Sequence, residues 1–386
     1  MANNKKTDTT VKLKDNWFLK LLDGEKSSRI AIPVFSVLIS LVVASVFMIL
    51  LGKNPFTALA AFLRGCGLIP KPNYAGGQGM ITDFMTFLDI LSPMLLASLG
   101  VIIAMKAGLF NIGIAGQMLL AGFTATVFVG YSGLGSWIAK PMVIIVGVVV
   151  GGLVGALIGF LKYRFNIHEV VSSIMLNYII SYVTGFFINT YYADQISRQS
   201  KVISNEARLT FTGVPLGAYK IRIPLGFIIA LIMVFAVRFL MDRTTTGLRI
   251  QTVGENRNCA EYAGINVGKN MVLAMFLSGI LAGLAGVTYY LGYFNSIVPK
   301  DLAGLGYDSI AVSLLGNTNP VGAIFASILV TIFQNGSVYM SSTIGVPKEI
   351  ASVITGIILL FSACGAYIKY LAHRRRTTVK SQKGEK

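Results

Sequence analysis

Repeated apolar runs of about twenty residues are the feature that most constrains how this chain can fold. A bilayer has a hydrocarbon core about 30 Å thick, which an α-helix crosses with about 20 residues. Because each crossing segment must satisfy its own backbone hydrogen bonds in lipid, the runs predict an all-α, polytopic transmembrane helical bundle of about ten segments. The runs lie near 30–51, 84–105, 113–131, 140–161, 170–192, 224–241, 270–292, 302–317, 319–340 and 350–371.

The charge content agrees with a chain that is solvated mostly by lipid. Only 13% of the 386 residues are charged, and the mean hydropathy is +0.70, whereas a soluble domain carries about 25% charged residues. The net charge of +17 could suggest nucleic-acid binding. Lysine and arginine instead gather in tails and short loops beside the apolar runs, where they set orientation and meet anionic lipid headgroups. This distribution argues against a nucleic-acid partner.

The two basic tails predict the orientation. Residues 1–29 are basic and polar, and the run that follows is long enough to be an anchor rather than a cleaved signal peptide. The tail 372–386 carries a cluster of three arginines. The positive-inside rule places both tails in the cytoplasm, on either side of a membrane domain at 30–371. Two cytoplasmic ends require an even number of crossings, so 302–317 is expected to cross, although it is short, glycine-rich and could be re-entrant.

Three loops between the runs are long enough to have a function of their own. Residues 52–83 and 193–223 are expected outside, as docking surfaces or as simple connectors. Residues 242–269 are expected inside. There Glu255 to Tyr262 predicts a short helix that ends before Gly264, since glycine often follows a helix end. A folded inside loop is a natural contact for a cytosolic partner.

Motifs for catalysis or metal binding are missing from the sequence. Gly268-Lys269 is followed by Asn270 and completes no P-loop, so any ATP hydrolysis must come from another chain. There is no H-E-x-x-H or G-x-S-x-G motif, and the two histidines, His168 and His373, are both near the inner surface. We therefore expect no catalytic residue, no metal and no cofactor. The cysteines are too far apart in sequence to indicate a disulfide framework or a zinc site: Cys66, Cys259 and Cys364.

Glycine and polar residues interrupt one apolar segment in each half of the chain. The first interruption is 106–117 and the second runs from 304–309 to 316–320. In transporters, paired interruptions of this kind point to the substrate path, while tight packing with hydrogen-bonded amides is an equally good alternative. Asn189 and Asn335 are open to the same two interpretations. The candidate pathway residues are Asn111, Gln117, Asn177, Asp308, Ser309, Asn317 and Gln334.

An aromatic run near the outer end of the seventh segment also allows two interpretations. It fits an interfacial belt, and it could alternatively stack a planar ligand. The run consists of Tyr289, Tyr290, Tyr293 and Phe294.

Five stretches in the chain carry a resemblance to a known family: GLFNIGIAGQMLLAGF (108–123), HEVVSSIMLNYI (168–179), TGLRIQTVGENRNCAEYAGINV (246–267), LSGILAGLAGV (277–287) and GYDSIAVSLLGNTNPVG (306–322). In these stretches the chain resembles the permease subunits of ABC importers, in the class that serves branched-chain amino acids, ribose-type sugars and nucleosides. The nearest likeness is to purine nucleoside importer permeases, and it covers roughly residues 84–370.

The resemblance implies a type II importer architecture and a set of partners. These are a second permease, usually non-identical, a cytosolic ATPase that consumes the ATP, and an extracellular substrate-binding lipoprotein that delivers a nucleoside. Many relatives carry an acidic residue where this chain has Ala115, so no role for that carboxylate transfers. By likeness, the ATPase-coupling residues are Gly254, Glu255, Asn256, Ala260, Tyr262, Ala263 and Gly264.

Three alternatives to nucleoside import remain at this point. The substrate could be a pentose or another small polar solute. An ion-coupled secondary transporter would need titratable groups within the membrane, for which Asp89 and Asp308 are the candidates. A channel-like or scaffold subunit would transport nothing itself.

Overall fold

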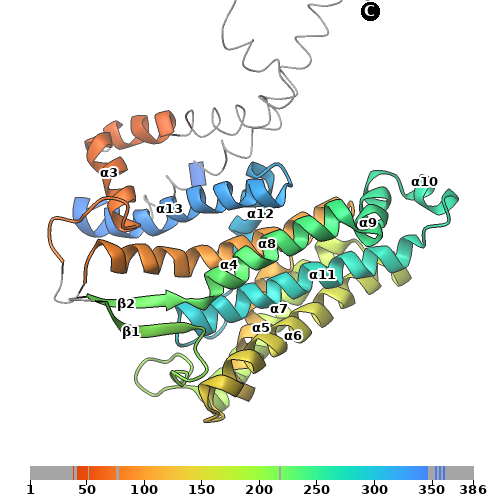
Figure 1. Ribbon diagram of the computed structural model, residues 1–386, viewed down its shortest axis with the longest axis horizontal. Helices are drawn as coiled ribbons and strands as arrows, with labels where there is room; N and C mark the ends of the chain where they lie inside the picture. The colour runs from red at the N-terminus through yellow and green to blue at the C-terminus, as the bar shows by residue number, and fades with distance from the viewer. Residues whose placement is uncertain are drawn as a thin grey trace, which may run out of the picture.

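The computed structural model describes residues 41–50, 52–74, 78–216 and 219–346, with the single positions 38, 353, 356, 357 and 360. These residues form a helical bundle with one small β-hairpin (Figure 1). The helices are α3 (Pro55–Gly65), α4 (Met80–Lys106), α5 (Ile114–Ala125), α6 (Ser136–Phe165), α7 (Glu169–Phe187), α8 (Leu225–Arg243), α9 (Thr245–Glu255), α10 (Arg257–Tyr262), α11 (Val267–Thr288), α12 (Leu305–Leu315) and α13 (Pro320–Ile344). Three π-helical turns extend α5, α7 and α11: η1 (Thr126–Gly130), η2 (Ile188–Tyr192) and η3 (Tyr289–Tyr293).

Six helices in the described part of the chain are long and apolar enough to cross a membrane. They are α4, α6, α7 with η2, α8, α11 with η3, and α13. The expectation of a polytopic helical membrane protein is therefore confirmed. Each of these helices matches an expected segment to within a few residues, because an unbroken apolar run fixes the length of the helix that has to bury it.

Two expected segments form shorter helices. The run at 113–131 becomes α5 and η1, together Ile114–Gly130. The run at 302–317 contains only the eleven residues of α12, which extend about 16 Å, or half the apolar thickness of a bilayer. The segment at 30–51 is described only in part, and α3 lies at 120° to the helix Leu41–Leu50 that precedes it. The segment at 350–371 and both tails lie almost wholly outside the described residues.

Helix α4 is the centre of the bundle. Every residue from Leu91 to Ala104 is buried, and α4 packs against α8, α11, α12 and α13. A helix that is apolar all round is expected in such a central position.

Small residues allow α6 and α11 to pack with their backbones in contact. A Cβ added to Gly155 would lie 2.9 Å from the Gly279 Cα, and one added to Gly151 would lie 2.6 Å from the Gly283 Cα. Glycines four residues apart on facing helices are the usual device for close packing in membranes, where apolar burial gives little drive for helices to associate. The glycine-rich sequence of α11 therefore has a structural role.

Among the described residues, the loop between α7 and α8 contains the one departure from an all-α fold. Strands β1 (Thr210–Leu216) and β2 (Tyr219–Pro224) pair antiparallel, with an irregularity between Phe211 and Val214. The Thr210 hydroxyl donates to the buried Asp89 carboxylate of α4 at 2.9 Å. The Arg208 guanidinium donates to the Gly292 carbonyl in η3 at 3.1 Å. The hairpin is thus attached to the bundle, and Figure 1 shows it at the opposite end from α9 and α10.

Candidate translocation pathway

The break between α4 and α5 is built around a buried asparagine. Within residues 107–113, the Asn111 amide oxygen accepts a hydrogen bond from the Gly113 backbone N–H at 2.9 Å. The Asn111 amide nitrogen donates to the Ser278 hydroxyl of α11 at 2.9 Å and to the Gln117 side-chain oxygen at 3.2 Å. All three side chains are buried. Backbone freed by a helix break inside a membrane has to be covered by protein or water, and here these side chains cover it.

A second buried asparagine joins this break to two more helices. Asn177 of α7 accepts from the Gly116 N–H at 3.0 Å. Its amide nitrogen donates to the Ile112 carbonyl at 3.1 Å and to the Tyr307 hydroxyl of α12 at 3.4 Å. Asn111, Gln117 and Asn177 thus come together in one group, which we call the amide cluster. Ser278 and Tyr307 are partners that the sequence did not single out.

Helix α12 packs directly on the start of α5. A Cβ on Gly306 would lie 2.7 Å from the Ala115 Cα, so position 115 faces a tight helix contact in which a longer acidic side chain would not fit without movement. Ser309 is buried, and its hydroxyl donates to the Gly306 carbonyl at 2.7 Å. The two interrupted segments of the chain are therefore in contact.

The remaining three pathway candidates lie around α12 and α13. The Gln334 amide of α13 donates to the Asp308 carboxylate, and both side chains are only partly buried. Asn317 is separate from both groups, because it is exposed in the turn after α12 with a left-handed φ of 54°. Asparagine is one of the few residue types that tolerates this backbone conformation, so its residue type is explained by the turn.

The exposed faces of the long helices differ in polarity. Tyr178 and Tyr182 lie in the middle third of α7–η2 and are 57% and 61% exposed. The Lys300 ammonium lies 5.6 Å from the centre of the Tyr182 ring. Because an ammonium at membrane depth is costly against lipid, we expect this part of the surface to face a cavity or another protein. The exposed side chains of α6 and α8 that would face lipid are by contrast apolar: Met142, Ile145, Val149, Leu153, Leu157, Phe160, Ile228, Ile232, Phe235 and Phe239.

The expected inside loop contains two helices rather than one. Thr244 caps α9 by accepting from the Gly247 N–H at 3.1 Å. Asn256 ends α9 and caps α10 by accepting from the Cys259 N–H at 3.1 Å. Gly264 follows α10 with a φ of +75°, as its place after a helix end predicted. The expected helix Glu255 to Tyr262 is therefore α10, and α9 was missed, although Thr244 is a recognisable cap.

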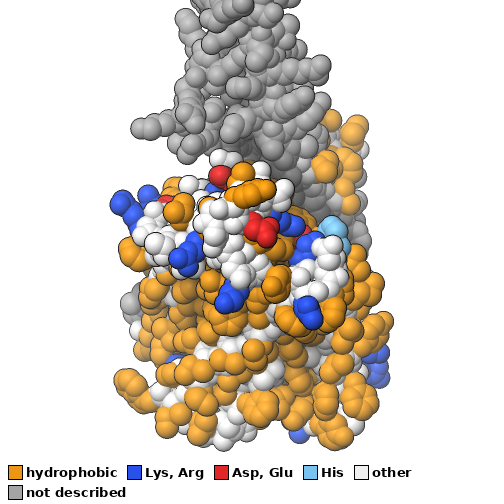
Figure 2. Space-filling view, turned by 90° about the vertical axis from the view of Figure 1, so that its right-hand side faces the viewer, with side chains coloured by type: hydrophobic (Ala, Val, Ile, Leu, Met, Phe, Trp, Pro, Cys, Tyr) orange, Lys and Arg blue, Asp and Glu red, His pale blue; other side chains and the backbone are white. Residues whose placement is uncertain are grey.

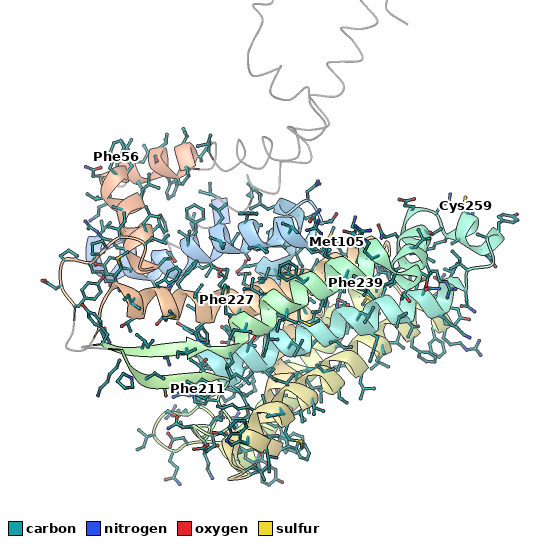
Figure 3. The ribbon with its side chains drawn as sticks, in the orientation of Figure 1. Phe56, Met105, Phe211, Phe227, Phe239 and Cys259 are labelled. Atoms are coloured by element: carbon teal, nitrogen blue, oxygen red, sulfur yellow. The ribbon has the colours of Figure 1, made fainter. Side chains whose placement is uncertain are left out.

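Helix α9 touches the break before α5 through backbone atoms. A Cβ on Gly254 would collide with the Lys106 carbonyl oxygen and lie 2.9 Å from the Gly108 N. The opposite surface of α9–α10 is free, with Tyr262 95% exposed and Leu248 64% exposed. In Figure 3, Cys259 lies on α10, and Met105, next to the C-terminal end of α4, lies toward the same end of the bundle. A movement of α10 would therefore pass through α9 to the Lys106–Gly108 backbone, which leads to Asn111.

Mixed charges surround this exposed element. Figure 2 views the same end of the molecule. It shows basic and acidic side chains across the upper part of the described surface, above a broad apolar region. The exposed charges are Arg164, Arg243, Arg249, Arg257 and Lys269, with Asp242, Glu255 and Glu261. Within the described ranges, no group of three or more His, Cys, Asp and Glu side chains is placed to hold a metal ion.

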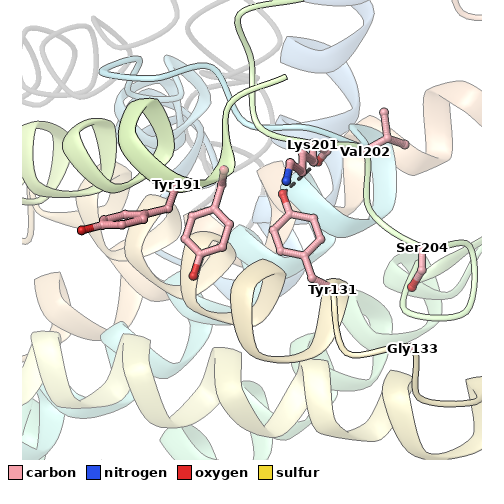
Figure 4. Close-up of a pocket in the computed structure, with 8 residues that line it drawn as sticks. Tyr131, Gly133, Tyr191, Lys201, Val202 and Ser204 are labelled. Carbon is pink, nitrogen blue, oxygen red and sulfur yellow. Dashed lines mark hydrogen bonds between the residues drawn. The ribbon is translucent and has the colours of Figure 1, made fainter. Parts of the chain in front are cut away.

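A pocket at the other end of the bundle was not predicted. It lies between the ends of η1 and η2, has a volume of about 450 Å³, and is lined by three tyrosines and Lys201 (Figure 4). The one local signal was the pair Tyr191-Tyr192 at the end of an apolar run.

The comparisons with known proteins agree on one family. The family described as the permease component of branched-chain amino acid transport systems matches residues 84–363. Guanosine ABC transporter permease protein NupP of Bacillus subtilis is 32% identical over 90% of this chain and 97% of its own length. Nucleoside ABC transporter permease proteins NupB and NupC of Lactococcus lactis are 29% and 26% identical, over 94% and 68% of this chain and 100% and 83% of theirs. No solved structure matches the chain significantly.

Proposed function

The chain belongs to the family of permease components of branched-chain amino acid transport systems, and we propose that it is the membrane permease subunit of an ATP-driven importer of nucleosides. It is a multi-pass protein of the bacterial cell membrane. The observation that carries the transport mechanism is the contact of the exposed α9–α10 element with the break that leads to the buried amide cluster. The names of NupP and NupB, similar over nearly their whole lengths, support a nucleoside as the substrate.

We propose a heteromeric pore. Two permeases of Lactococcus lactis, NupB and NupC, are both similar to this chain, which supports a second, non-identical permease as its partner. The face of α7 that carries Tyr178 and Tyr182 is the natural wall of a path closed by that partner, because polar groups there need water or protein. The α6 and α8 faces would then remain in lipid.

The energy comes from a separate cytosolic ATPase in this proposal, because the sequence has no P-loop. The ATPase binds α9–α10 through Glu255, Asn256, Tyr262 and their neighbours. A substrate-binding lipoprotein delivers the nucleoside at the opposite end, where the hairpin lies (Figure 1). The path alternates between outward- and inward-open states, and ATP drives this cycle only if the ATPase makes different contacts with the two states.

With α9–α10 on the cytoplasmic side and the hairpin outside, we propose that the whole chain crosses the membrane ten times and has both tails in the cytoplasm. The segment before α12, together with α12, accounts for one crossing in a broken form. Its half-length helix supports that assignment, since an unwound stretch is tolerated at membrane depth where protein or a cavity covers it.

Nucleoside uptake in cells that lack this chain tests the proposal. We expect initial uptake of radiolabelled guanosine to be lost on deletion and restored by the chain expressed in trans. Unlabelled nucleosides should compete with the label, while ribose and branched-chain amino acids should not. Unchanged guanosine uptake after deletion would refute nucleoside import. Competition by ribose would assign the permease to pentoses.

A further inference from the structure

The pocket between η1 and η2 has the size and lining of a small-molecule site. Its volume of about 450 Å³ lies within the usual range of ligand pockets, about 300–1,000 Å³. Three of its eight lining residues are tyrosines, and only Lys201 is charged. The lining residues are Gly130, Tyr131, Gly133, Tyr191, Tyr192, Lys201, Val202 and Ser204.

Backbone hydrogen bonds hold the walls of the pocket in place. The Tyr131 hydroxyl donates to the Lys201 carbonyl at 2.8 Å (Figure 4). The Lys201 N–H donates to the Tyr192 carbonyl at 2.9 Å, and the Ser204 N–H donates to the Gly130 carbonyl at 3.2 Å. The pocket is therefore formed before any ligand arrives, which lowers the entropic cost of binding.

The loop that forms one wall is also fixed from behind. The Ser200 N–H donates to the Ile297 carbonyl at 2.9 Å, and the Ser200 hydroxyl accepts from the Ile297 N–H at 2.8 Å. Asp194 accepts from the Ser197 hydroxyl at 2.9 Å, and this bond lowers the pKa of the carboxyl group. The wall at Lys201 thus has little freedom to collapse into the pocket.

The tyrosine rings leave an aromatic surface open to a ligand. Tyr131 and Tyr192 are stacked, with ring centres 5.7 Å apart and an angle of 22° between their planes, so no second ring fits between them. Tyr191 is tilted by 60° from Tyr192 and is 62% exposed. Figure 4 shows the Tyr191 ring at the end of this row, away from Lys201. A planar ligand would stack on the free surface of Tyr191.

The π-helical turn η2 connects this pocket to the exposed face of α7 that carries Tyr178 and Tyr182. Tyr178, Tyr182 and Phe186 are exposed at intervals of four residues, as one stripe of an α-helix requires. Tyr191 follows Phe186 by five residues, the spacing of a π turn. The ring centres of Phe187 and Tyr191 lie 6.2 Å apart, which continues the contact between turns. The pocket therefore lies at the outer end of this row of exposed aromatic residues, which we assign to the wall of the translocation path.

We propose that this pocket is an outer transit site for a planar, uncharged heterocycle, namely the base of a nucleoside. The base stacks on Tyr191, and Lys201 lines the other side of the pocket, where its ammonium donates to a more distant acceptor of the same nucleoside. Lys201 disfavours a cationic ligand, and the aromatic row favours a base over a free sugar because every base has a π-face. The identity of the ligand rests on the proposed function, whereas the existence and lining of the pocket are independent of it.

An interfacial aromatic belt would also place tyrosines at this depth, and the experiment separates the two roles. Membrane vesicles from cells that express the complete transporter are photolabelled with an azidopurine nucleoside, and the labelled peptides are identified. We expect label in the segments 126–137 or 188–204, displaced by guanosine and not by ribose. Tyr191→Ala should reduce labelling roughly tenfold, the usual loss when a base loses one stacking partner.

Matched variants make the result decisive. Tyr191→Phe should keep the label, and Trp137→Ala should leave it unchanged, because Trp137 is 94% exposed at the same end but does not line the pocket. Lys201→Ala, which spares every backbone bond, should weaken labelling a few-fold and covers the case in which Tyr191→Ala fails to fold.

Equal labelling of wild-type protein, Tyr191→Ala and Lys201→Ala at equal membrane abundance would overturn the pocket inference. If deletion of the chain abolishes guanosine uptake in the same strain, only the pocket inference has failed. Uptake that survives deletion would mean that the proposed function has failed.

Discussion

The two interrupted segments of the chain differ in how completely their polar groups are satisfied. At the first break, Asn111, Gln117 and Asn177 are at most 1% exposed. Asn111 bonds to Gln117 and to Ser278 of α11, while Asn177 bonds to the backbone of the break and to Tyr307 of α12. At the second, Asp308 and Gln334 bond mainly to each other and remain partly exposed. The sequence patterns of the two breaks are similar, yet their structural environments are different.

This difference indicates two different roles. A fully bonded buried network fixes one geometry and is costly to disturb. The first break is therefore suited to transmit a movement from α9, which touches it at Gly254. Partly exposed polar groups tolerate change and can meet water or a solute, so the second break is better suited to line a path.

The largest effect is expected at Gly254, where α9 meets the first break. Gly254→Ala would push a methyl group into the Lys106 carbonyl and the Gly108 backbone. Overpacking costs about 1–3 kcal/mol, and here it would displace α9 from the break, so guanosine uptake should fall roughly tenfold or more. Stimulation of the ATPase by the loaded binding protein in the assembled transporter should fall in parallel. These two rates are the measurement.

A glycine at the opposite end of the bundle provides the control. Gly135→Ala meets no atom within 4 Å of its Cβ, and alanine tolerates its φ of −65°, so uptake should be retained. Tyr262→Glu, on the exposed surface of α10, should uncouple transport without lowering the amount of protein in the membrane. Normal transport by both Gly254→Ala and Tyr262→Glu would show that α9–α10 is not the coupling element.

A smaller effect, mainly on stability, is expected at the amide cluster. Asn177→Ala leaves the Gly116 N–H and the Ile112 carbonyl without their partner, and unpaired buried groups cost about 1–3 kcal/mol each. The midpoint of thermal unfolding of the purified chain in detergent should therefore fall. Asn189→Ala, which removes an exposed amide from the same helix, should leave it unchanged. Equal midpoints for the two variants would mean that the cluster does not hold the break.

Local sequence predicts some parts of this molecule well because a single physical constraint decides them. The length of an apolar run determines α4, α6 and α11, since a bilayer admits a narrow range of helix lengths. The hydrogen bonding of Asn111 within the break was also predictable in kind, because buried amides at a helix break need partners. Ser278 was missed because a lone serine in a glycine-rich helix gives no signal until its neighbours are known.

The missed parts depend on contacts between distant segments. The hairpin is held by Asp89 and Gly292, which lie far from it in sequence. The tyrosine pocket exists because Ser200 is tied to Ile297, and because a π turn adds one residue to a helical turn without a change in composition. The sequence indicated that the segment 302–317 is short, but not where α12 begins, because an apolar run does not reveal the start of its helix.

The smallest effect is expected at Asp308, where the second break faces the proposed path. Asp308→Asn removes a charge but keeps an oxygen that can accept from Gln334, so the unfolding midpoint should hardly move and uptake should fall only a few-fold. In an ATP-driven importer this residual uptake keeps the wild-type dependence on pH and resists a protonophore. In an ion-coupled transporter a titratable carboxylate at this position would carry the coupling ion. The same variant would then abolish the response of uptake to pH, and a protonophore would stop uptake by the wild-type protein. The measurement is the initial uptake rate across the physiological pH range, with and without the protonophore. It decides whether Asp308 and Gln334 line the substrate path or whether Asp308 carries a coupling ion that drives uptake.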